Sequence, residues 1–123
     1  MRLLLDTHVL LWWLTDDRRL TGDHRDLISD AANSALVSAM TVAEIAIKSS
    51  LGKLDAPDDL LPTLDAGGFE HLPFEASHAD VLRTLPWHHR DPFDRMLIAQ
   101  AIVEGLTIMT VDPHFAAYDV ARR

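Results

Sequence analysis

Short apolar segments that resemble β-strands alternate with longer helical segments along all 123 residues of the chain. Strands separated by helices need crossover connections, which favour a parallel sheet with helices on both faces. The pattern therefore predicts the α/β class, with a central, mainly parallel sheet. We expect strands at residues 2–5, 35–38, 69–74 and 106–110, a short edge strand at 118–120, and helices at 9–14, 23–32, 41–51, 57–66, 75–85 and 92–104.

Composition restricts the kind of protein further. Hydrophobic residues make up 48% of the chain, enough for one domain spanning residues 1–123 to bury a core. The absence of cysteine excludes a disulfide scaffold, a cysteine nucleophile and a thiolate zinc site. Asp6 interrupts the first apolar run, and no segment reaches the length of a membrane span, so we expect a cytoplasmic protein without membrane contact.

The formal charge of −8 argues against a generic nucleic-acid-binding module, which carries a basic face. Acidic side chains can still act on nucleic acid if they gather around a bound cation, because the cation inverts the local field. The position of the acids along the chain therefore matters more than their number.

Four acids map to one edge of the predicted sheet. Asp6 ends the first strand, Glu44 and Asp94 lie near the starts of two helices, and Asp112 follows the last strand. In a parallel α/β sheet the carboxyl ends of strands and the starts of the following helices share one edge, where ligands bind. The sequence thus predicts an acidic site at this edge.

Three of these acids also have a local explanation. The segment from Thr41 to Glu44 has the layout of a capping box, and Asp94 suits the dipole of a helix capped by Asp91. Asp112 precedes a proline, as in an ordinary turn. Asp6 is harder to explain locally, because an acid directly after a buried strand is costly unless it is paired or bound to a cation.

An acidic cluster suits Mg²⁺, which prefers oxygen ligands and keeps several of its waters. No phosphate-binding glycine loop and no serine–histidine–acid pattern is present. A receiver domain would need an aspartate after a middle strand and a lysine after a late one, but Phe74–Glu75 and Asp112 stand there. A dehalogenase-type phosphatase would need a second aspartate at position 8, which is His8.

Four segments resemble the motifs of PIN-domain proteins, and more closely the VapC-like toxins of type II toxin–antitoxin pairs. The resemblance spans nearly the whole chain, in order and at fitting spacing, and the third segment is the most specific. The segments are Leu4-Leu5-Asp6-Thr7-His8-Val9-Leu10-Leu11-Trp12, Thr41-Val42-Ala43-Glu44-Ile45, His89-Arg90-Asp91-Pro92-Phe93-Asp94-Arg95-Met96-Leu97-Ile98-Ala99-Gln100-Ala101 and Thr110-Val111-Asp112-Pro113-His114-Phe115.

The resemblance implies a PIN-like three-layer α/β/α sandwich and an endoribonuclease that depends on Mg²⁺ or Mn²⁺ and hydrolyses RNA phosphodiester bonds with an activated water. It also implies a homodimer and inhibition by a cognate VapB-like antitoxin. Asp6 and Asp94 match the acids most directly linked to metal, and Glu44 and Asp112 match the other two family acids. Thr7, Thr110 and Asp91 are expected to support the site. The alternative is a catalytically weak PIN-like module that binds a metal or a partner.

Several other residues carry weaker expectations. We expect His88 and His89 to lie in a solvated loop and Lys48 to form a surface ion pair with Glu44. Arg95 follows Asp94 and is a weak candidate for contact with an RNA phosphate. The apolar run at residues 9–14, with Trp12 and Trp13, has more apolar surface than one side of a short helix needs, and is expected to contribute to a protein interface.

Overall fold

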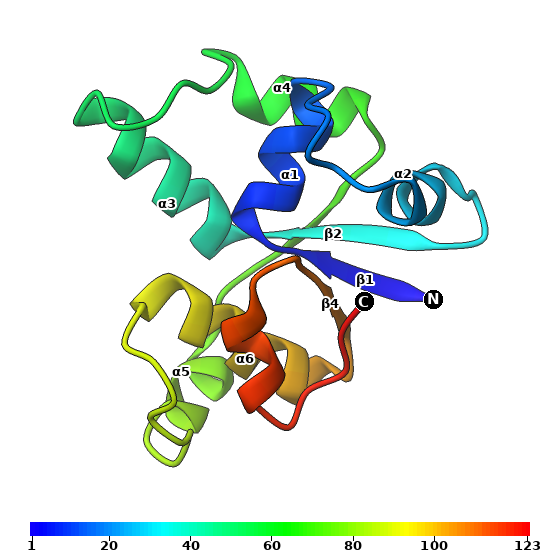
Figure 1. The fold of residues 1–123 in the computed structure, drawn as a ribbon. Coiled ribbons are helices and arrows are strands. Elements are labelled where there is room, and N and C mark those ends of the chain that lie inside the picture. Colours follow the sequence, from blue (N-terminus) through cyan, green and yellow to red (C-terminus); the bar gives the residue numbers. More distant parts are fainter.

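A four-stranded, wholly parallel sheet with the strand order β3-β2-β1-β4 organises the chain (Figure 1). The structure is a computed structural model that describes residues 1–123. Its elements in chain order are β1 (Arg2–Leu5), α1 (Thr7–Leu14), α2 (Gly22–Ser29), β2 (Ser34–Ser38), α3 (Ala39–Ser50), α4 (Leu60–Ala66), β3 (Glu70–Leu72), α5 (Ala76–Val81), α6 (Pro92–Glu104), β4 (Thr107–Met109) and the 3₁₀ helix η1 (Pro113–Ala117).

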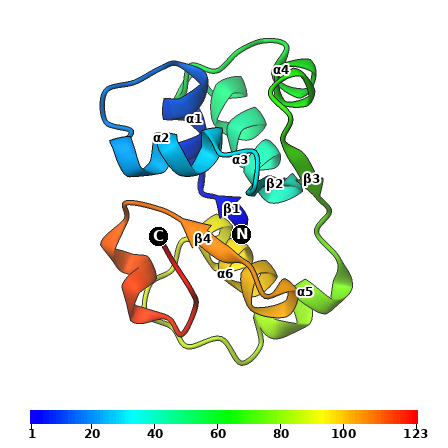
Figure 2. The ribbon, with the colours of Figure 1, turned by 90° about the vertical axis from the view of Figure 1, so that its right-hand side faces the viewer.

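Helices cover both faces of the sheet, which confirms the predicted α/β sandwich. Alternate side chains of β1 point to opposite faces, so Leu3 and Leu5 join one buried cluster and Leu4 joins the other. Helices α1 to α4 lie on the first side, and α5, α6 and η1 lie on the second (Figure 2). No helix is both long and apolar enough to cross a membrane.

Helix α6 begins and ends where its sequence indicates. The Asp91 side chain caps it by accepting hydrogen bonds from the backbone N–H groups of Phe93 and Asp94, and Pro92 occupies the first helical position. Gly105 ends the helix with φ of 66°, a conformation that glycine adopts without strain. The predicted span 92–104 is therefore confirmed.

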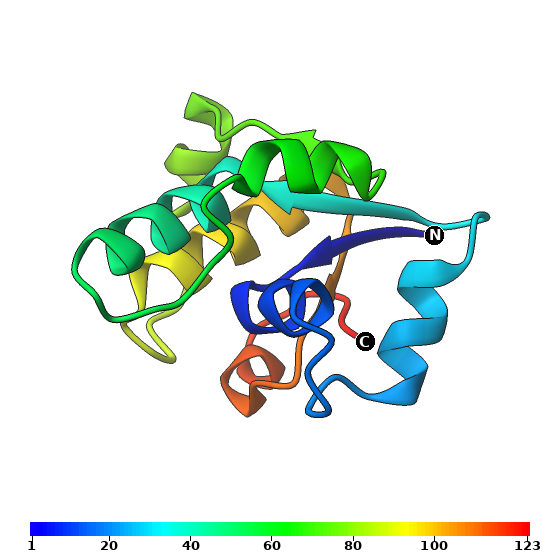
Figure 3. The same cartoon turned by 90° about the horizontal axis from the view of Figure 1, so that it is seen from above.

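A buried polar contact places α6 against the carboxyl ends of β2 and β3. The Ser38 hydroxyl, at the end of β2, donates to Oε1 of Gln100 at 2.6 Å, and Nε2 of Gln100 donates to the Pro73 carbonyl at 3.2 Å. Both side chains are fully buried, so neither can exchange this contact for water without cost. Viewed from above, α3 and α6 lie at the end of the sheet towards which β1 and β2 point (Figure 3).

Several predicted boundaries differ from the structure. Helix α3 begins at Ala39 rather than Thr41, because the Ser38 side chain caps it through the N–H of Met40. The predicted helices at 23–32, 57–66 and 75–85 are shorter, and β3 is limited to Glu70–Leu72. The predicted edge strand at 118–120 is wrong, since the parallel bridge to β4 is made by Arg122 instead.

Candidate functional site

Asp6 stands where β1 ends and α1 begins. Its backbone N–H donates to the Met109 carbonyl at 3.1 Å, which brings it beside the end of β4. Its carboxylate caps α1 by accepting from the N–H of Val9 at 2.8 Å, and it also accepts from the Thr110 hydroxyl at 2.5 Å. Only 3% of Asp6 is exposed, and this burial raises the pKa of its carboxyl group. A capping role for Asp6 was not predicted from the sequence.

Glu44 does not form the predicted capping box. Because Ser38 caps α3, Glu44 lies in the second turn and its side chain is free to face the sheet edge. Its Oε1 accepts from the Thr7 hydroxyl at 2.5 Å, and its Oε2 accepts from Nζ of Lys48 at 2.5 Å. The carboxylate is thus fixed by residues of α1 and α3. The predicted ion pair with Lys48 forms, but it is not at the surface on the Glu44 side, where only 7% of the side chain is exposed.

Asp112 and Asp91 both cap helices. The predicted cap is confirmed for Asp91, whereas the turn predicted at Asp112 is the start of η1. Oδ1 of Asp112 accepts a hydrogen bond from the backbone N–H of His114 and also lies 2.9 Å from Nδ1 of the same histidine. The backbone N–H of Asp112 donates to the Thr110 hydroxyl. Thr110 therefore connects Asp6 to Asp112. The predicted supporting residues Thr7 and Thr110 each bond directly to one of the four acids.

Asp94 lies at the electrostatic centre of the site. Burial raises its pKa from 3.8 to about 7, and the carboxylates of Asp91, Asp112, Glu44 and Asp6 raise it in the same direction. Hydrogen bonds through Thr110 also connect Asp6 to Asp112. The acids that the sequence placed at this edge therefore lie within electrostatic range of Asp94.

The donor set suits a hard cation such as Mg²⁺ or Mn²⁺. No three acidic or imidazole side chains lie close enough to hold one ion between them. Mg²⁺ needs only one or two direct carboxylates and fills its other positions with water, so the arrangement is compatible with it. The cluster already holds the ammonium group of Lys48. The hydrogen bond from Lys48 to Glu44, together with the nearby carboxylates of Asp91 and Asp94, raises the pKa of Lys48.

The expectation of a solvated loop is wrong for His89. Only 11% of its side chain is exposed, its Nε2 lies 3.3 Å from Oδ2 of Asp94, and its ring stacks on His114 with centroids 5.4 Å apart. Burial lowers its pKa, as does the neighbouring His114. His88 is exposed, as predicted.

Arg95 is a buried structural residue. Its guanidinium donates to the carbonyls of Leu85 and Pro86 and to the Tyr118 hydroxyl, and it lies over the Trp87 ring with its Cζ 3.7 Å from the centroid. It therefore fixes the loop that carries His89, a role that the sequence did not indicate.

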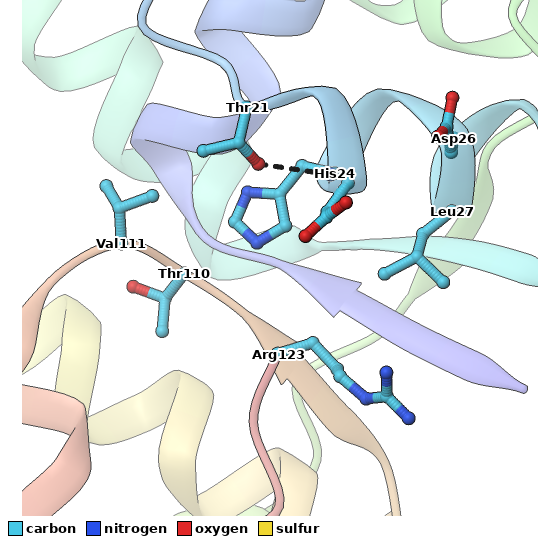
Figure 4. A pocket seen from close by; sticks show the side chains of 8 residues that line it. Thr21, His24, Asp26, Leu27, Thr110, Val111 and Arg123 are labelled. Atoms are coloured by element: carbon cyan, nitrogen blue, oxygen red, sulfur yellow. Dashed lines mark hydrogen bonds between the residues drawn. The ribbon is translucent and has the colours of Figure 1, made fainter.

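A pocket of about 660 Å³ lies next to the acidic cluster, between α2 and the end of β4 (Figure 4). His24, Arg123 and Thr110 contribute to its walls, but none of the four acids does. Thr110 is thus the only residue that the pocket shares with the site described above. The acidic edge is therefore distinguished by its chemistry and not by a deep cavity.

Comparisons with known proteins agree with this fold. The model of the PIN domain family matches residues 3–121. None of the curated proteins compared with the chain is significantly similar to it in sequence.

Three solved structures illustrate the structural similarity. VapBC2 from Rickettsia felis, bound to a DNA fragment from its promoter, has a TM-score of 0.74 and 16% identity, covering 100% of this chain and 98% of that one. FitAcB from Neisseria gonorrhoeae has a TM-score of 0.66 and 26% identity, covering 98% of this chain and 95% of that one. VapBC-5 from Mycobacterium tuberculosis, of the VapBC family of toxin–antitoxin systems, has a TM-score of 0.59 and 24% identity, covering 99% of this chain and 95% of that one.

Proposed function

The chain belongs to the PIN domain family, and we propose that it is a metal-dependent endoribonuclease that acts as the toxin of a toxin–antitoxin pair. Membership confirms the resemblance identified from the motifs. One observation carries the proposal: the Asp94 carboxyl is buried beside four other carboxylates at one sheet edge, and its burial together with their charges raises its pKa to about 7. Such crowding of like charges is costly, and groups arranged in this way mark candidate functional sites.

Asp6 and Asp94 would hold Mg²⁺ or Mn²⁺ directly, with Glu44 and Asp112 beside them. When bound, such an ion stabilises the charge that develops on a phosphodiester during hydrolysis and makes water a stronger nucleophile. The protein's own contribution is to orient the carboxylates before substrate arrives. Thr110 fixes Asp6, and Thr7 fixes Glu44.

Lys48 has a separate role in this proposal. Its Nζ lies 2.5 Å from Oε2 of Glu44, and 42% of its side chain is exposed. Lys48 therefore balances part of the negative charge while remaining accessible. An accessible ammonium group can also attract an RNA phosphate, which the net charge of −8 would otherwise repel. The substrate class therefore depends on a local field and not on the charge of the whole chain.

The proposed partner is a VapB-like antitoxin, because the similar solved structures include VapBC assemblies. The apolar run at residues 9–14 is less available for it than the sequence suggests, since its first three residues are buried in the core. More exposed apolar side chains stand at Ile47 on α3, at Leu51 directly after α3 and at Leu61 on α4. Leu61 also lines a pocket of about 450 Å³ between α3 and α4. We propose this surface for the antitoxin, and a homodimer as the toxin's assembly.

Purified protein free of antitoxin tests the activity. We expect it to cleave a mixed RNA pool in Mg²⁺ but not in EDTA, and we expect Asp94→Asn to abolish cleavage. Asp23→Asn is the matched control, because Asp23 also lies in the first turn of a helix but is not among the acids around Asp94. Cleavage that persists in EDTA would contradict the metal mechanism, and metal binding without cleavage would favour the weak binding module.

A further inference from the structure

Asp94 receives its only side-chain hydrogen bond from His89. Nε2 of His89 lies 3.3 Å from Oδ2 of Asp94, and Nδ1 lies 2.8 Å from the Tyr118 hydroxyl. Both ring nitrogens thus face a polar partner. A neutral imidazole has one donor and one acceptor nitrogen, so the role of His89 depends on which nitrogen carries the proton.

The hydrogen bonds of the Tyr118 hydroxyl decide between the two tautomers. A phenol oxygen accepts at two lone pairs and donates one proton. Arg95 donates to this oxygen from Nη1 at 3.1 Å, and the backbone N–H of His89 donates to it at 3.3 Å. Both lone pairs are therefore used, and the phenol proton has Nδ1 of His89 as its acceptor. Nε2 then carries the ring proton and donates to Asp94.

The start of this chain of hydrogen bonds is fixed in place. Arg95 is 3% exposed, cannot lose its proton, and is anchored by the carbonyls of Leu85 and Pro86. It can only donate to Tyr118, so the direction of the hydrogen bonds cannot reverse. The stacking of His89 on His114, with 6° between the ring planes, also restricts rotation of the imidazole.

We infer that Arg95, Tyr118 and His89 form a directional hydrogen-bond chain that orients the Asp94 carboxylate, with His89 as a neutral positioning residue protonated at Nε2. The bond occupies Oδ2 and leaves Oδ1 of Asp94 available to a cation. Groups that orient metal-binding side chains in this way influence metal affinity about 10- to 100-fold. The inference builds on the proposed function where it takes Asp94 as a metal ligand.

Histidine tautomers can be measured without metal or substrate. In ¹⁵N-histidine-labelled protein, long-range ¹H–¹⁵N correlation at about pH 8.5, where imidazoles are neutral, should show His89 as the Nε2–H tautomer. His89→Gln identifies its signals among those of the seven histidines. Tyr118→Phe should introduce the Nδ1–H tautomer, because Nδ1 loses its donor. A wild-type Nδ1–H tautomer, or no change in Tyr118→Phe, would overturn the inference.

Mn²⁺ titration by calorimetry tests the positioning role. Tyr118→Phe and His89→Phe should weaken Mn²⁺ binding about 10-fold or more, whereas His89→Gln, whose amide N–H can replace Nε2, should retain most of the affinity. His88→Asn is the matched control, since the His88 ring packs on the Tyr118 ring in a T-shaped arrangement, with centroids 4.8 Å apart, but makes no bond to Asp94. Thermal melts would confirm that each variant folds.

The outcomes separate this inference from the proposed function. Weaker Mn²⁺ binding in Tyr118→Phe with the predicted tautomer supports the hydrogen-bond chain even if wild type cleaves no RNA, in which case only the proposed activity fails. Unchanged affinity in Tyr118→Phe, an equal loss in His88→Asn, or no Mn²⁺ binding by wild type would overturn the positioning role of His89, even if RNA is cleaved.

Discussion

Replacing Asp94 with asparagine should stabilise the metal-free protein at neutral and higher pH, although it removes an acid from the first turn of a helix. Burial and four neighbouring carboxylates raise the pKa of Asp94 from 3.8 to about 7. One pKa unit corresponds to about 1.4 kcal/mol, so ionised Asp94 destabilises the folded state by at most about 4 kcal/mol. Asparagine has nearly the same shape and carries no charge.

The sign of the pH dependence follows from linkage. The folded-state pKa lies above the unfolded value, so the folded protein binds more protons between about pH 4 and pH 7. The contribution of Asp94 to the free energy of unfolding therefore falls as pH rises through this window, and levels off above it. The gain from Asp94→Asn should be absent below about pH 4 and complete near pH 8.

Two effects reduce the gain below its upper limit. The Asp94 side chain is 21% exposed, so solvent weakens the repulsion. Losing a charge near the helix start also costs some tenths of a kcal/mol to about 1 kcal/mol. We therefore expect Asp94→Asn to be about 1–3 kcal/mol more stable than wild type near pH 8 in EDTA.

Urea unfolding in EDTA across this pH range, repeated with Mg²⁺, measures the effect. Mg²⁺ at 100 times its Kd should stabilise wild type by about 2.7 kcal/mol and the variant much less. Asp23→Asn, at the start of α2, should show only the loss expected from the helix dipole. If Asp94→Asn is less stable than wild type in EDTA and responds equally to Mg²⁺, Asp94 is a helix-start residue and the reasoning is refuted.

Two further changes test the support of the site and the proposed partner surface. Thr110→Val should lower the free energy of unfolding by about 1–3 kcal/mol in urea titrations, because it leaves Asp6 without its hydroxyl donor. The control Thr110→Ser keeps the hydroxyl and should cost less than about 1 kcal/mol. Equal losses in the two variants would contradict this role of Thr110. Ile47→Glu should weaken antitoxin binding about tenfold or more in titrations with the co-encoded antitoxin, while Ile102→Glu, a similarly exposed side chain on α6, should not; equal effects would exclude the proposed surface.

Local signals in the sequence were sufficient where only one cap was possible. Asp91, Pro92 and Gly105 define both ends of α6, and the structure places them as predicted. The start of α3 was mistaken because Ser38 and Thr41 are both hydroxyl residues that can cap a helix. Ser38 caps because it is the last residue of β2, and the end of that strand depends on its pairing with β1 and β3.

The acidic cluster could be predicted because parallel topology alone brings strand ends and helix starts to one edge. The environment of His89 could not. Its contact with Tyr118 joins residues 29 positions apart, and it forms only because η1 folds back against the loop before α6. The sequence around His89 is polar and contains no periodic pattern, so it indicated a loop exposed to solvent.

The hydrogen bonds at the site suggest how a repulsive cluster is kept in order. Each of the four acids has a side-chain donor or imidazole partner from the chain: Thr110 for Asp6, Thr7 for Glu44, His114 for Asp112 and His89 for Asp94. These partners fix the orientation of the carboxylates but bring no permanent positive charge. Such a charge comes from Lys48, which pairs with Glu44. The repulsion is therefore retained in the metal-free protein, and the divalent cation that we propose would relieve it on binding. Neutralising Asp94, which neither caps a helix nor pairs with a permanent cation, should for this reason increase stability as it removes activity, which is the trade-off expected of a preorganised site.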